Sequence, residues 1–182
     1  CFYNSYGDSG MSSILKVDTI QTTAGASPNL SDIGFSTANT IIAAYYATSS
    51  STAQTNNTNS HANITGLSIT MTPKLATSKI LIQGIIAGES YGSYADRGLR
   101  LGIYGGASGT TFLYDSQYEH YMSNDATQRI GKSTIAYIES ASSTSARTYN
   151  ISFCSTITNG NAVARVNQYG KPSQMLVYEI GQ

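Results

Sequence analysis

The chain carries little charge and no tryptophan. The shortage of charge argues against several classes of function. Charged residues make up 11% of its 182 residues, and ten basic side chains balance ten acidic ones. The usual charged share in soluble domains is about 25%. A neutral chain lacks the electrostatic footprint that nucleic acid or an anionic membrane surface requires. No apolar run approaches the roughly 20 residues of a membrane span. We therefore expect no nucleic-acid binding and no membrane insertion.

Cysteines and metal-binding motifs are equally scarce. The two cysteines, Cys1 and Cys154, lie at opposite ends of the chain without metal-ligand spacing. Cys154 falls in an expected strand, where a small buried thiol is the simplest interpretation. The chain contains no phosphate loop, dinucleotide fingerprint, CxxC or HExxH motif. The sequence therefore predicts no disulfide framework, no metal site and no cofactor.

Serine, threonine and short alternating patterns are abundant instead. Residues 67–72 alternate apolar and hydroxyl side chains and stop at Pro73, as a half-buried strand does. Residues 80–86 are apolar on both faces, which predicts a central, covered strand. About nine short strands separated by turn residues predict an all-β, antiparallel, jelly-roll-like β-sandwich. The other expected strands are residues 40–47, 99–104, 111–114, 133–138, 149–154, 162–166 and 176–180.

Helical patterns are weak. Only residues 114–122 and 126–130 could hold a turn or two of helix, and neither shows a 3.6-residue apolar stripe. Residues 49–60 are polar and low in complexity, which predicts a long exposed loop. The expected organisation is an N-terminal arm at 1–24, a linker at 25–38 and a β-sandwich head at 39–182.

Residues 12–21 read SSILKVDTIQ, the pattern of a short amphipathic strand. A lone strand is not stable in water, so it must pair with or pack on something else. The segment resembles the opening of many tailed-bacteriophage fibre proteins, especially those of marine and cyanobacterial phages. In that family a variable, Ser/Thr-rich β-domain follows it, and the natural opening looks like Met11. Residues 1–10 are then an upstream extension, a processed start or part of a longer polypeptide.

The resemblance implies a non-enzymatic virion protein, a trimeric fibre or appendage on the tail or capsid surface. The arm would join another virion protein, and the sandwich would contact a host surface glycan or protein. A trimer would also bury apolar and tyrosine faces that a low-charge monomer exposes. Two alternatives stay open: a head fibre or capsid-decorating protein, and a jelly-roll module that binds or depolymerises a glycan. The expected anchoring side chains are Ile14, Leu15, Val17 and Ile20.

Fourteen tyrosines give the main binding signal of the sequence. A tyrosine ring offers a flat apolar surface and a hydroxyl and loses little rotamer entropy, which suits adhesive surfaces. Sugar recognition uses such rings beside amides and carboxylates, although packing at the subunit contacts of an oligomer is the favoured explanation. The candidate receptor or glycan contacts are Tyr91, Tyr94, Tyr114, Asp115, Gln117, Tyr118 and Tyr121.

Catalytic patterns are present only in weak form. Residues 88–92, GESYG, match the nucleophile elbow, but that motif requires a helix directly after the serine. The histidine of such a triad must come after the serine in the chain, and His120 is the only one that does. His61 lies in a polar loop with no partner visible in the sequence. A depolymerase needs paired carboxylates in a groove. The candidates, whose spacing is not specific, are Asp96, Asp115, Glu119 and Asp125. We therefore expect that the protein is not an enzyme.

Overall fold

The structure, a computed structural model, describes residues 38–94, 97–121 and 128–182. The expected arm, with Ile14, Leu15, Val17 and Ile20, lies outside the described residues, as does nearly all of the linker. Residues 37–182 form one compact unit. Within the described part of this unit, no helix has the length and apolarity to cross a membrane.

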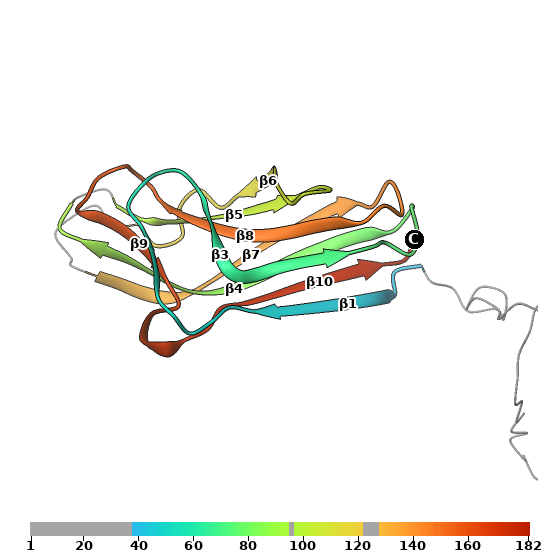
Figure 1. The fold of residues 1–182 in the computed structure, drawn as a ribbon, viewed down its shortest axis with the longest axis horizontal. Helices are drawn as coiled ribbons and strands as arrows, with labels where there is room; N and C mark the ends of the chain where they lie inside the picture. Colours follow the sequence, from blue (N-terminus) through green and yellow to red (C-terminus); the bar gives the residue numbers. More distant parts are fainter. Residues whose placement is uncertain (1–37, 95–96, 122–127) are drawn as a thin grey trace, which may run out of the picture. The chain divides into compact units, whose positions relative to one another are not determined.

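Two antiparallel sheets stack on each other (Figure 1). In the six-stranded sheet, β1, β10, β4 and β7 lie side by side, β9 continues the position of β10 along β4, and β2 pairs with β9. The four-stranded sheet has the order β3-β8-β5-β6. The bounds are β1 (Ile41–Thr48), β2 (Gln54–Asn56), β3 (Ala62–Met71), β4 (Lys79–Gly92), β5 (Leu99–Gly105), β6 (Thr111–Asp115), β7 (Gln128–Ser140), β8 (Arg147–Ser155), β9 (Ala162–Val166) and β10 (Gln174–Ile180).

This strand order is that of a jelly roll. The chain moves repeatedly from one sheet to the other, so that each sheet holds strands from both halves of the sequence. Two interlocked Greek keys produce this arrangement. The all-β, antiparallel, jelly-roll-like sandwich expected from the sequence is therefore confirmed, with ten strands among the described residues.

Alternating side chains from the two sheets form the core between them. Strand β4 buries Ile80, Ile82 and Ile86, while β8 buries Tyr149, Ile151 and Phe153 as the sequence pattern predicts. Full burial of such a side chain contributes about 1.5–3 kcal/mol. Gly84 lies among them, and a Cβ at this position would come within 2.3 Å of the Ile151 side chain. The core is thus close-packed where the two sheets cross.

Three local expectations need correction. Residues 49–60 are not simply an exposed loop, because β2 (Gln54–Asn56) lies within them. The helical turns considered at 114–122 and 126–130 overlap strands β6 and β7, and the helix of the described residues is the short 3₁₀ turn Gln168–Gly170. Strand β4 is central as predicted, but its outward side chains are only half-buried. Sheet pairing prevails over these weak local patterns.

Candidate functional site

Four connections meet at the end of the sandwich opposite the C-terminus (Figure 1). They are the links β2–β3, β4–β5, β6–β7 and β8–β9, and we call their described residues the loop end. Backbone hydrogen bonds tie them together: Ser155 N donates to Thr58 O at 2.9 Å, and Ser93 N donates to Asn161 O at 3.1 Å. The loop end is therefore a joined surface rather than four separate loops.

Three of the predicted contact tyrosines, Tyr94, Tyr118 and Tyr121, lie in the loop end, and Tyr91 lies beside it near the end of β4. Tyr91, Tyr94, Tyr118 and Tyr121 keep 38%, 45%, 62% and 42% of their surface exposed. The rings of Tyr118 and Tyr121 meet edge to face, with centroids 5.3 Å apart. Such exposed, mutually supported rings can bind an apolar or sugar face without much loss of side-chain entropy.

A hollow of about 290 Å³ lies beside Tyr91 at this end. Its lining includes Tyr91, Gly92, Ser93 and Asn161. The Arg165 guanidinium lies 3.6 Å from the centre of the Tyr91 ring, a cation–π contact that holds the ring in place. Gly92 has a φ of 123°, and a Cβ there would approach the Asn161 carbonyl oxygen to 1.9 Å, so the shape of the hollow requires glycine.

Of the other three predicted contact residues, Tyr114 and Asp115 lie on β6, and Gln117 is an exposed residue of the β6–β7 link. Tyr114 is on β6 and stacks on Tyr137 of β7, with ring centroids 6.0 Å apart, at the open edge between the sheets. The Asp115 carboxylate is only 11% exposed and binds Arg100. Gln117 donates its backbone N–H to Asp115 Oδ1 at 2.8 Å. The seven predicted residues therefore do not form a single surface.

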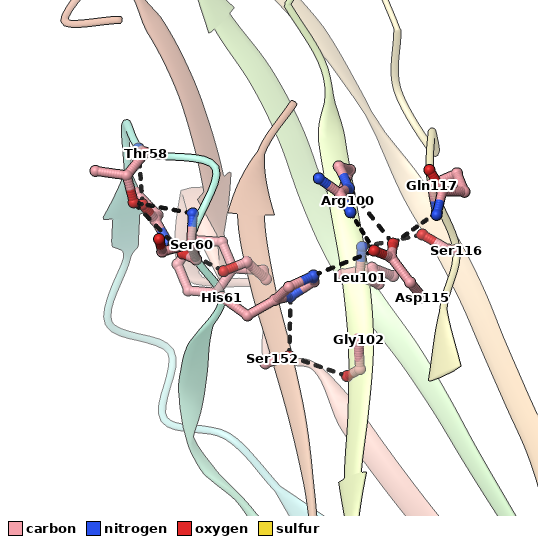
Figure 2. Close-up of polar contacts among 12 residues, drawn as sticks. Thr58, Ser60, His61, Arg100, Leu101, Gly102, Asp115, Ser116, Gln117 and Ser152 are labelled. Atoms are coloured by element: carbon pink, nitrogen blue, oxygen red, sulfur yellow. Dashed lines mark hydrogen bonds and ion pairs between the residues drawn. The ribbon is translucent and has the colours of Figure 1, made fainter. Parts of the chain in front are cut away.

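Asp115 belongs instead to a polar cluster on the outer face of the four-stranded sheet, formed by His61, Arg100, Asp115 and Ser152 (Figure 2). His61 lies between two partners: its Nδ1 is 3.1 Å from Ser152 Oγ, and its Nε2 is 3.7 Å from Asp115 Oδ2. Arg100 donates hydrogen bonds from Nε and Nη2 to the two oxygens of the same carboxylate. No partner of His61 is visible in the sequence, because Ser152 is 91 residues away in the chain.

Burial and charge set the protonation states of this cluster. Burial lowers the pKa of His61, and the opposing effect of Asp115 does not restore it. Burial raises the pKa of Asp115, but hydrogen bonds from Arg100 and Gln117, with the Arg100 and His61 charges, outweigh it and leave that pKa below its usual value. A neutral His61 carries one ring proton, either on Nδ1, where it is donated to Ser152 Oγ, or on Nε2, where it faces the Asp115 carboxylate.

Serine, histidine and aspartate in contact raise the question of a catalytic triad. Ser152 is fully buried, and its Oγ also lies 3.2 Å from the Gly102 carbonyl oxygen. A substrate cannot reach this hydroxyl in the folded protein, so the cluster acts as a structural tie between β3, β5, β6 and β8. The elbow serine, Ser90, is likewise fully buried inside β4.

Metal binding has no support in the described part of the chain. No group of three or more His, Cys, Asp or Glu side chains comes together among residues 38–94, 97–121 and 128–182. His120 contacts Ser133 instead, with Nε2 3.1 Å from the serine Oγ.

No model of a known protein family matches the chain, and no curated protein matches it significantly. Among solved structures it is similar to VP2 of infectious bursal disease virus. A mutant VP2 in T=1 particles aligns with a TM-score of 0.39 and 12% identity, over 75% of this chain and 36% of that chain. The VP2 subviral particle gives 0.38 and 11%, over 78% and 38%. A similarity at these values does not indicate a function. The jelly-roll assignment depends on the strand order described above.

Proposed function

We propose that this chain is a non-enzymatic structural protein of a virion, a fibre or fibre-like appendage. Residues 1–24 attach it to another virion protein, and the loop end contacts the host surface. The proposal begins from the resemblance of residues 12–21 to phage fibre openings. The homotrimer that this resemblance implies remains a prediction.

One structural observation supports this division of roles. The described chain begins beside the C-terminus, where Asn39 N donates to Gly181 O at 2.7 Å and Gly181 N donates to Thr40 O at 2.9 Å. The tyrosine-bearing loops are at the opposite end of the sandwich (Figure 1). An arm joined at residue 38 can therefore be anchored while the loop end stays free.

The chemistry of the loop end favours a glycan as the host ligand. Exposed aromatic rings stack on the apolar faces of sugars, and the amide of Asn161 and the hydroxyl of Ser93 beside Tyr91 supply hydrogen bonds. The two acidic candidates that the structure describes, Asp115 and Glu119, form no open pair: Asp115 is engaged by Arg100. We therefore propose that the loop end binds the glycan without hydrolysing it.

A capsid-decorating protein with the same fold is the second candidate, since it would differ only in the docking partner of the arm. Electron microscopy of particles on which this protein is labelled distinguishes the fibre from the capsid-decorating protein. Labels at tail fibres support the fibre assignment, and labels over the capsid surface support decoration.

Two sets of variants test the two halves of the proposal. Deleting residues 13–21 is expected to leave a folded head that no longer joins particles, and unchanged incorporation would refute the anchoring role. Replacing Tyr118 and Tyr121 together by alanine is expected to abolish binding to host cells without changing the thermal unfolding temperature. The control is Tyr169→Ala, an exposed tyrosine outside the loop end; equal binding loss in the control would refute the loop-end assignment.

A further inference from the structure

The outer face of the six-stranded sheet is apolar where β1, β10, β4 and β7 lie side by side. The strand register places four apolar residues in one row across the sheet: Ala44, Tyr178, Leu81 and Ile138. The adjacent row has a single amide among its four members: Tyr46, Leu176, Gln83 and Ala136. We call these two rows the apolar face.

Several of these side chains face solvent rather than the core. Tyr46 is 62% exposed and Ile138 is 56% exposed, at opposite edges of the sheet. Neither row contains a charged residue. In the two flanking rows the charged residue is Lys79, whose Nζ is already 2.8 Å from Ser140 Oγ. Contiguous exposed apolar surface of this kind marks an interaction site in a soluble protein.

The outer face of the four-stranded sheet provides an internal comparison. On β3 the exposed residues 68 and 70 bear hydroxyl groups, and Thr70 Oγ1 lies 2.8 Å from Thr148 Oγ1 of β8 across the two strands. Ser68 is exposed on the same face. This is the usual polar exterior of an antiparallel sheet whose other side packs on a core. Along β3 and β8 this second outer face is therefore polar, unlike the apolar face.

From this pattern we infer that the apolar face packs against the same face of a second copy of the chain. A two-fold axis parallel to the strands lays β1 of one copy over β7 of the other. Tyr46 then meets the small Ala136, and Ile138 meets the small Ala44. At the ends of both rows a large side chain thus meets a small one, which makes the face complementary to itself there, as an isologous interface requires.

The size of the face fits a modest dimer interface. Four strands about 4.8 Å apart and about seven residues long at 3.3 Å per residue span roughly 20 Å by 23 Å. Two such faces bury on the order of 1,000 Å², the lower limit of a specific interface. Sheets that pack face to face keep their strands within about 30° of each other, which the proposed axis allows. The pairing does not depend on the proposed function, and it is an alternative to the homotrimer that the resemblance implies.

The mass of the full chain in solution tests the pairing, measured by light scattering at two concentrations. The expected species has twice the mass of one 19.3 kDa chain. Ile138→Lys and Tyr46→Lys place a charge in the apolar face and are expected to weaken association at least 100-fold, leaving monomers. Because both side chains are more than half exposed in one copy, the unfolding temperature of the monomer should not fall. The control Ser68→Lys adds the same charge on the other outer face and should remain a dimer.

A double variant, Ala44→Cys with Ile138→Cys in a Cys1→Ser background, tests the geometry directly. In one chain the two positions are three strands apart, about 14 Å, which is too far for a disulfide. Oxidation is expected to give covalent dimers only. Wild-type monomers at both concentrations, or an Ile138→Lys variant that stays dimeric, would overturn the inference. A three-copy species would overturn the face-to-face pairing while supporting the fibre-type trimer, so the two proposals can fail separately.

Discussion

The imidazole Nε2 of His61 lies 3.7 Å from Asp115 Oδ2, and the two side chains are only 7% and 11% exposed. The pair joins the start of β3 to the end of β6 across the outer face of the four-stranded sheet. Because the burial that lowers the pKa of His61 exists only in the folded protein, the pair makes stability depend on pH.

The sign of this dependence follows from linkage. The pKa of His61 in the folded protein is below its usual value of about 6.5, so below about pH 6.5 the unfolded chain binds a proton that the folded protein does not bind. The contribution of His61 is complete at higher pH and is lost as the pH falls from the unfolded pKa to the folded one. We expect the free energy of unfolding in urea to fall between about pH 7.5 and about pH 5.5, and to fall less in His61→Gln. Equal slopes for the two proteins would contradict the assignment.

Gly84 is the point at which the two sheets leave no room for a side chain. A Cβ there would lie 2.3 Å from Ile151 Cδ1 and 3.1 Å from Ile135 Cγ2, both in the core. Overpacking of this kind costs about 1–3 kcal/mol, so Gly84→Ala should lower the urea midpoint by a corresponding amount. Gly160→Ala is the matched control, because nothing lies within 4 Å of its Cβ position. Similar midpoints for the two variants would mean that the core relaxes around the added methyl group.

The fold was largely predictable from the sequence because sheet faces follow a two-residue period. The alternation at residues 67–72, 99–104 and 149–154 located strands of the four-stranded sheet directly. Strand β2 was missed because its three residues, Gln54–Asn56, have no apolar alternation and depend on pairing with β9. A strand formed by its partner leaves no local signal.

The candidate site was predictable only in part, for a related reason. Exposed tyrosines in polar segments were located from composition, and three of them do lie in the loop end, with Tyr91 beside it. The burial of Asp115 on the outer face of the four-stranded sheet was not predictable, because it depends on Arg100 and His61, which are not its neighbours in the sequence. Long-range polar pairs have no period in the sequence, and they appear only when the register of the sheets is known.

Glu179 shows how a pattern can conceal a buried charge. Leu176, Tyr178 and Ile180 do share a face, but it is the outer one. The core face of β10 carries Glu179, which is fully buried. Alternation located the strand without telling which of its faces was inside.

The Glu179 carboxylate closes the connection between β3 and β4. Its Oε1 accepts the backbone N–H groups of Lys74 at 2.8 Å and Leu75 at 3.0 Å, and the Ser78 hydroxyl at 2.8 Å. Glu179→Ala removes all three interactions and should destabilise the fold by at least about 2 kcal/mol. Glu179→Gln keeps an acceptor oxygen and should lose less, and Glu119→Gln serves as a half-buried control on a loop. Chemical denaturation measures the series, and wild-type stability in Glu179→Ala would show that other groups hold this turn.

Cys154 lies on the outward side of β8 yet is fully buried, so its reactivity reports on opening of the four-stranded sheet. Burial raises the pKa of its thiol to about 11, which leaves about one thiolate in a thousand at about pH 8. In a Cys1→Ser background, which leaves a single thiol, we expect iodoacetamide to label Cys154 only slowly in native buffer. Labelling is measured by mass spectrometry, and its rate should increase sharply across the urea transition. If native labelling is as fast as in the unfolded chain, the sheet opens locally without global unfolding, and the contacts of Arg100 and Ser152 beside it do not close this face.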